Sequence, residues 1–331
     1  MTNPDPAVVV DLIEAFRRSK TMFAAVSLGV FDKLADGPAA AAALAAGCDL
    51  DAMIRLLDAC VGLGLLARDG DRYVNTPAAA AYLCRSSPLT LAGYIQYSND
   101  VLSQLWPHLE DAVREGSHRW RQAFGLEGPI FSSFFKTEAA MREFILGMHG
   151  FGMLSSPAVA AAFDLSRFHR LVDLGGATGH LAAAAHERYP SLQAAVFDLP
   201  QVIGYAREFA AAAHIELIAG DFFADPLPPA DLYAVGRILH DWSEEKIRRL
   251  LARVFDHLPS GGGLLIAEKL LEEDKSGPVS AQMQSLNMLV CTEGKERTPS
   301  EYAALLRAAG FARIDWRRTG TVLDAVLAVK P

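Results

Sequence analysis

The strongest constraint on the fold is the stretch RLVDLGGATGH at residues 170–180. Its apolar run, 171–174, stops at a cluster of glycines, and a helical pattern follows over about 180–189, before a proline. A buried strand that enters a glycine turn and then a helix is typical of an open α/β sheet. Ligands of such sheets bind outside the carboxyl ends of the strands, so this turn is a candidate nucleotide site.

Two aspartates indicate the kind of nucleotide. The dinucleotide fingerprint G-x-G-x-x-G fails because Ala177 and Thr178 stand where it needs glycine. Asp173 ends the first strand, and Asp198 closes the run 194–198, about 20 residues past the glycines, where a carboxylate can accept both ribose hydroxyls. Either feature alone also fits a glycine turn with solvated carboxylates. Together they predict a nucleoside cofactor and resemble the acidic loop of class I S-adenosylmethionine methyltransferases.

The rest of the C-terminal half alternates between strand and helix patterns, which predicts a Rossmann-like α/β sheet. Further strands are expected at 194–198, 215–219, 230–235, 264–271, 314–318 and 325–329. Ser243 precedes two glutamates and is the expected N-cap of a helix. The sequence Thr-Pro-Ser-Glu at 298–301 is a capping box, so a helix is expected from there to Gly310.

One histidine is placed where chemistry could occur. His240, in RILHDW at 237–242, follows a predicted strand and reaches the ligand edge of the sheet. Glu268 on the next strand and Glu296 before the capping box could orient it. A lone histidine is more often structural, and either glutamate alone fits a surface ion pair equally well. A neutral imidazole oriented by a carboxylate suits a general base that removes a hydroxyl proton.

The N-terminal region resembles a winged helix-turn-helix. A small helix, a helix over 49–62 and a hairpin at Asp69–Gly70 follow one another within residues 39–76. The candidate recognition helix offers only Arg55 as a cation among three aspartates, and the chain carries a net charge of -8. DNA binding needs clustered positive charge. We therefore expect a homodimerisation module and no nucleic-acid or anionic-membrane partner.

The remaining sequence features predict an ordinary intracellular protein. Asp11 and Glu14 interrupt the apolar N-terminal run, so we expect no secretory signal. No apolar run approaches the ~18 residues of a membrane span. The four cysteines are scattered, which favours a reduced, cytoplasmic setting, and no metal site is expected.

We expect three segments. Residues 1–105 form the winged-helix dimerisation domain, 106–165 a helical connection that lines a substrate pocket, and 166–331 the cofactor-binding catalytic domain. The region 77–165 is rich in aromatic residues. Some of these could form an apolar pocket for a planar substrate, although most should be core.

Longer strings carry a more specific resemblance. They are FDLSRF at 163–168, GDFF at 220–223, DPLPPADLY at 225–233, RILHDW at 237–242 and QSLNMLVCTEGKERT at 284–298. The chain resembles the plant-caffeate-type S-adenosylmethionine-dependent O-methyltransferases over nearly its whole length, and within them the branch that methylates N-acetylserotonin. The resemblance implies a homodimer that methylates a hydroxyl of an aromatic small molecule, a phenol or hydroxyindole.

It also implies catalytic and acceptor-binding roles. His240 would be the general base, with Glu268 and Glu296 as its flanking acids. The residues implied to face the acceptor are Asp241, Asn287 and Cys291.

The cofactor S-adenosylmethionine is implied to contact five residues. Gly175 would lie beneath it and Asp198 would hold the ribose. Asp221 and Phe222 would lie at the adenine, and Arg237 at the methionine end.

Four positions depart from the acetylserotonin branch. Cys291 stands where that branch has glutamine on the acceptor side, Gly152 where the animal enzyme has a tryptophan near the cofactor, Phe135 where it has a tyrosine, and Ala177 where it has the third loop glycine. N-acetylserotonin is therefore one candidate acceptor among several. The alternative from another class is an inactive, cofactor-binding winged-helix regulatory or structural protein.

Overall fold

The computed structural model describes residues 4–126, 138–210 and 213–331. The chain divides into two compact units, Met1–Val101 and Leu102–Pro331.

The first unit combines helices with a three-stranded antiparallel sheet of order β1-β3-β2. Its elements are α1 (Ala7–Ser27), α2 (Val30–Lys33), β1 (Ala39–Ala40), α3 (Ala41–Leu44), α4 (Leu50–Gly62), β2 (Leu66–Asp69), β3 (Arg72–Asn75), α5 (Pro77–Tyr82) and α6 (Ala92–Tyr97). The two strands of the wing pair Asp69 with Arg72, so the predicted hairpin is confirmed. Phe31, Leu57 and Tyr73 lie at the centre of its core. This is the predicted winged-helix arrangement.

Charges on the candidate recognition helix are already paired. Asp49 caps α4 by accepting a hydrogen bond from the Ala52 amide at 2.8 Å, and Arg55 forms an ion pair with Asp51 at 2.5 Å.

Helix α1 carries an exposed apolar surface. Its members, each between 50% and 69% exposed, are Val8, Val9, Val10, Leu12, Ile13 and Phe16. A cluster of exposed apolar side chains on one helix marks an interaction surface.

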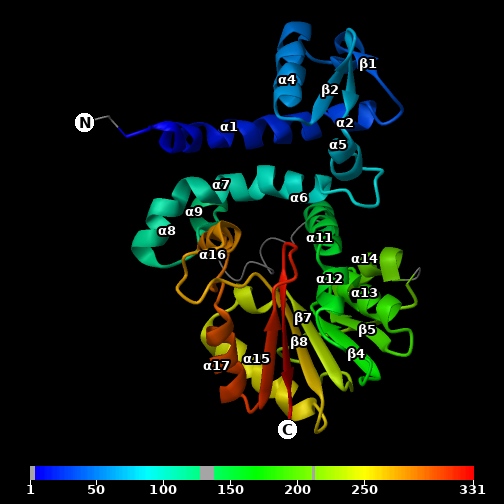
Figure 1. Cartoon of the computed structure of the whole chain (residues 1–331), viewed down its shortest axis with the longest axis vertical. Helices are drawn as coiled ribbons and strands as arrows, with labels where there is room; N and C mark the ends of the chain where they lie inside the picture. Colours follow the sequence, from blue (N-terminus) through cyan, green and yellow to red (C-terminus); the bar gives the residue numbers. More distant parts are fainter. Residues whose placement is uncertain (1–3, 127–137, 211–212) are drawn as a thin grey trace. The chain divides into compact units, whose positions relative to one another are not determined.

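The second unit contains a seven-stranded sheet of order β6-β5-β4-β7-β8-β10-β9 (Figure 1). Its strands are β4 (Arg170–Leu174), β5 (Gln193–Asp198), β6 (Glu216–Ala219), β7 (Leu232–Gly236), β8 (Gly263–Glu268), β9 (Arg313–Arg317) and β10 (Asp324–Val329). Its helices are α7 (Ser103–Leu105), α8 (Leu109–Glu115), α9 (Trp120–Phe124), α11 (Glu138–Met153), α12 (Ser156–Ala161), α13 (His180–Arg188), α14 (Pro200–Ala210), α15 (Glu244–His257), α16 (Val279–Cys291) and α17 (Pro299–Ala308). Strands β4 to β8 are parallel, whereas β10 is antiparallel to both its neighbours.

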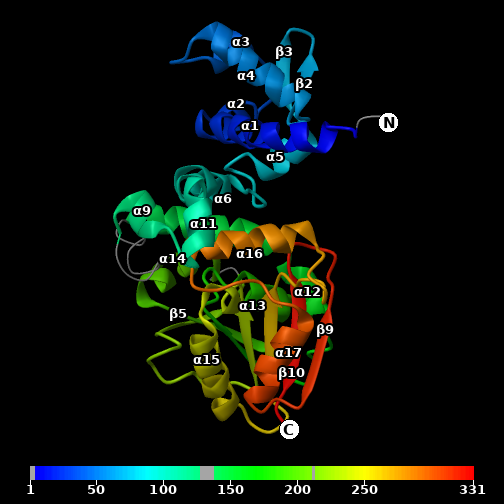
Figure 2. The ribbon, with the colours of Figure 1, turned by 90° about the vertical axis from the view of Figure 1, so that its left-hand side faces the viewer.

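Alternating side chains give the sheet two apolar faces. Ala194 and Val196 on β5 point to the core shared with α12, α13 and α14, and Ala195 and Phe197 point to the core shared with α15 and α17. Figure 2 shows α15 and α17 in front of the sheet. Chain order reverses between β4 and β7, and a sheet of this kind binds its ligand at that switch point.

Several predicted boundaries were wrong; the strand expected at 230–235, for example, spans Leu232–Gly236. The strand expected at 264–271 ends at Glu268, because Leu270 and Leu271 are buried without continuing the sheet ladder. The helix that starts with the confirmed Thr298 capping box ends at Ala308, not at Gly310. Among the residues that the structure describes, no helix is long and apolar enough to cross a membrane.

Candidate active site

The glycine loop after β4 leaves no room for side chains at two positions. Gly175 has φ +70, and a Cβ there would lie 2.6 Å from Cδ1 of Ile238. A Cβ on Gly176 would lie 2.6 Å from the carboxyl carbon of Asp173. Asp173 is 1% exposed, and burial raises its pKa to about 7. Asp173 therefore lies buried beneath the loop and does not point outward to bind a cofactor.

Asp198 stands at the end of β5 beside the same loop. Its Oδ2 accepts a hydrogen bond from the Ala177 amide at 2.9 Å, and its Oδ1 accepts one from the Leu199 amide at 2.7 Å. Ala177 makes its bond from a left-handed conformation, φ +49, which glycine would adopt without strain. The carboxylate is held in place with lone pairs left for ribose hydroxyls, as its predicted role requires.

The loop after β6 fits the adenine end. Phe222 packs against Gly175, since its ring would lie 3.3 Å from a Cβ there. Asp221 is tied into the turn: its amide donates to Asp225 at 2.8 Å, and its Oδ1 accepts from the Phe223 amide at 2.7 Å. Both residues of the predicted pair are half-buried.

Arg237 provides a half-buried cation at the end of β7. Its backbone amide donates to the Ala267 carbonyl at 2.9 Å, and its φ is +56. Its Nε and Nη1 are buried and have no hydrogen-bond partner in the described parts of the chain. Guanidinium nitrogens that are buried without a partner call for an anion. The glycine loop after β4, the Asp198 carboxylate and this cation together fit a nucleoside that carries an amino acid.

His240 lies in a 3₁₀ turn after β7 and is 3% exposed. Its Nδ1 is 2.7 Å from Oε1 of Glu296 and 3.3 Å from Oε2 of Glu268. Its Nε2 is 3.6 Å from Oδ1 of Asp241, which is too long for a hydrogen bond. The predicted acids therefore do meet one ring nitrogen and leave the other available.

Two local features bring the acids there. Glu268 uses its Oε1 to accept from the amides of Ile238 and Leu239 at 3.0 and 2.9 Å, so it holds the turn that carries His240. Gly294 lets the loop after α16 pass against that turn, because a Cβ there would lie 2.1 Å from the His240 carbonyl oxygen. Glu296 reaches the imidazole only because this approach is possible.

Burial raises the pKa of each acid in the cluster. It raises the pKa of Glu296 to about 8 and that of Asp241 to about 6, and it also raises the pKa of Glu268. Ligand atoms of His240, Glu268 and Glu296 lie within 4.8 Å of one another, a spacing that a metal ion could use. Because Glu268 already accepts backbone amides and Glu296 lies at hydrogen-bond distance from Nδ1, the arrangement suits proton transfer better.

Two of the predicted acceptor-facing residues, Asn287 and Cys291, adjoin one another on α16. Trp106 donates its indole N–H to Oδ1 of Asn287 at 2.9 Å, and the Cys291 thiol lies 3.6 Å from the same oxygen. Trp120 donates to the Cys291 carbonyl at 2.7 Å. Burial and the neighbouring Asp241 raise the pKa of the Cys291 thiol, which keeps it protonated.

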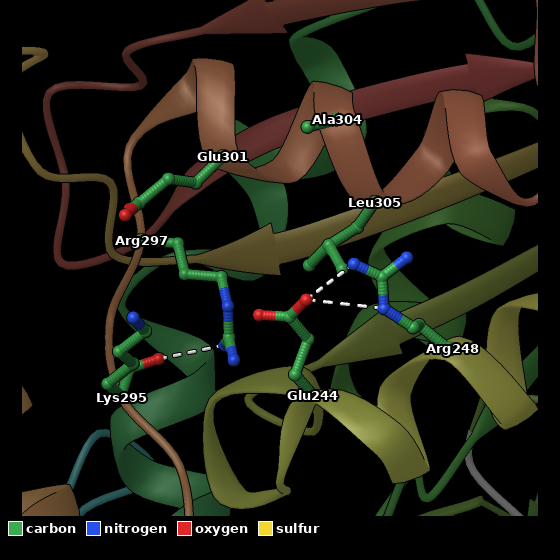
Figure 3. A pocket seen from close by; sticks show the side chains of 7 residues that line it. All are labelled: Glu244, Arg248, Lys295, Arg297, Glu301, Ala304 and Leu305. Carbon is green, nitrogen blue, oxygen red and sulfur yellow. Dashed lines mark hydrogen bonds and ion pairs between the residues drawn. The ribbon is translucent and has the colours of Figure 1, made fainter.

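A separate pocket lies between α15, α17 and the loop before α17 (Figure 3). Its lining residues are Glu244, Arg248, Lys295, Arg297, Glu301, Ala304 and Leu305. Arg248 pairs with Glu244, Glu301 closes the capping box, and Arg297 donates to the Lys295 carbonyl at 3.0 Å. Since these groups already have structural partners, we assign no ligand to this pocket.

Three features of the site were not predicted. Lys269 lies near Arg237, His149 bonds Thr178 of the glycine loop at 2.8 Å, and His180 packs on Gly152. Strand alternation after Glu268 could have indicated Lys269, whereas no sequence signal pairs residue 180 with 152. Phe135 lies outside the described residues.

Comparison with known proteins gives the family. An O-methyltransferase domain matches residues 106–312, and an O-methyltransferase dimerisation domain matches residues 10–85. The chain belongs to the O-methyltransferase family. As an O-methyltransferase it uses S-adenosylmethionine as its cofactor.

Its relatives cover nearly the full chain. It is 43% identical to the acetylserotonin O-methyltransferase of Gallus gallus, over 98% of this chain and 97% of that protein. A probable bifunctional dTTP/UTP pyrophosphatase/methyltransferase protein of Homo sapiens is 43% identical over 99% of this chain, which spans 54% of that protein. The crystal structure of human N-acetylserotonin methyltransferase in complex with SAM superposes with a TM-score of 0.95 at 40% identity, covering 100% of this chain and 99% of that one.

Proposed function

We propose that this O-methyltransferase methylates a hydroxyl group of an aromatic small molecule with His240 as general base. The observation that carries the proposal is the 2.7 Å contact between Nδ1 of His240 and Glu296. When Glu296 is ionised, Nδ1–H donates to it, which fixes the lone pair on Nε2. Nε2 then faces away from Glu268 and Glu296, and an acceptor hydroxyl can donate to it.

A base is needed because phenols ionise late. With a pKa near ~10, only about one phenol in 10³ is ionised at pH 7, a deficit of roughly 4 kcal/mol. General-base catalysis typically contributes about 10²- to 10⁴-fold, which offsets much of that deficit. The bound cofactor supplies an electrophilic methyl group. His240 takes the hydroxyl proton, Glu296 stabilises the resulting imidazolium, and Glu268 holds the turn.

The acceptor would be recognised from α16 and the 3₁₀ turn. Asn287 receives the Trp106 N–H on its oxygen, so its amide nitrogen remains to donate to the acceptor. Asp241 and Cys291 would flank the acceptor. Relatives named acetylserotonin O-methyltransferase make N-acetylserotonin a candidate, but Cys291 offers no amide where that branch has glutamine. A wider set of phenols and hydroxyindoles is therefore the expected substrate class.

The dimerisation domain and the exposed apolar side chains of α1 support a homodimer. The rival function, a cofactor-binding regulator without turnover, would need the glycine loop and Asp198 but not the imidazole with its two buried acids. The His240 cluster therefore favours an enzyme.

The test is methyl transfer to a panel of phenols and hydroxyindoles that includes N-acetylserotonin. We expect His240→Ala to lower kcat by about 10² or more and to leave the affinity for S-adenosylhomocysteine within about two-fold. His257→Ala, an exposed histidine on α15, is the matched control and should not change kcat. Unchanged turnover in His240→Ala would remove the base assignment, and a wild-type chain inactive on the whole panel would favour the regulator.

A further inference from the structure

Two cations meet one aromatic ring beside the glycine loop. The guanidinium carbon of Arg237 lies 5.0 Å from the centroid of the Phe151 ring, and Nζ of Lys269 lies 5.6 Å from it. Within the described parts of the chain, neither cation has a carboxylate within 4.0 Å or a side-chain hydrogen bond. Cation–π contacts compensate only part of the cost of withdrawing such charges from water. The pair is therefore arranged for an anion.

The sheet explains why these two residues converge. Arg237 directly follows β7, and Lys269 directly follows β8, which is paired with β7 in parallel up to Gly236 and Ala267. Alternation along β8 places Ala267 on the face covered by α13, and Lys269 is two residues further on. Glu268 lies on the opposite face, toward His240. The end of β8 thus places Glu268 beside His240 on one face of the sheet and Lys269 on the other face, where the cofactor is expected.

The expected position of the cofactor at this edge of the sheet indicates which anion binds here. If Asp198 holds the ribose and the adenine lies at Phe222, the amino-acid end of the cofactor extends toward Arg237. We propose that Lys269 binds the α-carboxylate of the cofactor together with Arg237, an inference that rests on the cofactor placement given above.

The charges of the neighbourhood agree with this role. Burial and the adjacent Arg237 lower the pKa of Lys269, and Glu296 opposes this shift only in part. Arg237 and Lys269 also oppose the rise in the pKa of Glu296. A carboxylate between the two cations would relieve their repulsion, and the remaining positive charge would favour the ionised form of Glu296.

The test compares two ligands that differ in the amino-acid end. S-adenosylhomocysteine carries the carboxylate, whereas 5′-methylthioadenosine keeps the nucleoside and thioether and lacks it. By calorimetry, we expect Lys269→Met to weaken S-adenosylhomocysteine binding about 10- to 100-fold and to leave 5′-methylthioadenosine binding within about two-fold. Lys269→Arg should retain most of the affinity. Lys275→Met, which removes an exposed lysine paired with Glu301, is the control and should change neither.

Other results would overturn the proposal. Equal weakening of both ligands would mean that Lys269 supports the pocket without contacting the carboxylate. Unchanged binding with a shifted pH profile of kcat would make Lys269 a counter-charge for Glu296. Unchanged binding with a raised KM only for carboxylated phenols would assign it to the acceptor. If Lys269→Met does not fold, Lys269→Gln is judged by the same two affinities. A wild-type chain that binds neither ligand would overturn the cofactor placement itself.

Discussion

Replacing Gly152 with alanine tests the packing that distinguishes this chain from the acetylserotonin branch. Gly152 lies near the end of α11, and a Cβ there would come within 2.3 to 2.5 Å of three ring atoms of His180. Carbon atoms in contact normally stay about 3.5 Å or more apart. The ring would have to move by about an ångström and would strain or lose its 2.8 Å hydrogen bond to Ser156.

The free-energy terms oppose one another. Overpacking costs about 1–3 kcal/mol and the lost hydrogen bond about 0.5–1.5 kcal/mol, whereas alanine gains up to about 1 kcal/mol over glycine in a helix. We expect Gly152→Ala to lower the free energy of unfolding by about 1–3 kcal/mol, hence Tm by about 2–6 °C. When His180→Ala has removed the ring, the same substitution should stabilise, because only the helix term remains.

Urea and thermal unfolding, followed by circular dichroism on the four members of the double-mutant cycle, measure this change of sign. Gly204→Ala in α14 is the matched control, since a Cβ there meets nothing within 4 Å and should stabilise in either background. A Gly152→Ala variant that is as stable as the control, or equally destabilised with and without the His180 ring, would refute the packing argument.

Three further outcomes follow from the site and the first unit. Asp198→Asn should weaken S-adenosylhomocysteine binding about 10- to 100-fold, because an amide replaces a charged ribose acceptor; wild-type affinity in calorimetry would contradict the ribose role. Burial raises the pKa of Glu296 to about 8, and when Glu296 is protonated, Nε2 of His240 carries the ring proton and cannot act as a base. We therefore expect kcat to rise with pH through about 8. A flat profile of kcat between pH 6 and 9 would exclude control of the reaction by the ionisation of Glu296. Leu12→Asp with Phe16→Asp should convert the dimer into monomers in sedimentation, and a variant that stays dimeric would place the interface elsewhere.

Much of this site could be predicted from the sequence because its signals are local. A strand that ends in glycine and a second strand that ends in Asp198 fix the cofactor edge, and the capping box at Thr298 was confirmed with both of its hydrogen bonds. His240 and Glu268 follow from the rule that parallel strands end at one edge. Glu296 was only a candidate from its place before the capping box, since its approach to His240 depends on Gly294 passing against the His240 carbonyl.

The sequence predicted strand boundaries wrongly where apolar residues are buried without pairing in the sheet. Leu270 and Leu271 continue the apolar run of β8, so the pattern predicted a longer strand, yet they are buried by packing outside the ladder. The sequence also gave no reason to expect Arg237 at φ +56. That conformation depends on the turn that follows β7 and on the amide bond to Ala267, contacts between elements about 30 residues apart.

The departures from the acetylserotonin branch are better understood as pairs than as single positions. At Gly152 the ring of His180, which comes from the helix after the glycine loop, lies where even a Cβ would have to be. Lys269 brings a cation to the ring of the adjacent residue, Phe151. Residues in contact change each other's energetic effect, so a role carried over one position at a time fails at such places. The cofactor wall of this enzyme is therefore defined by contacts between α11, α13 and the end of β8, which no single residue of the sequence identifies.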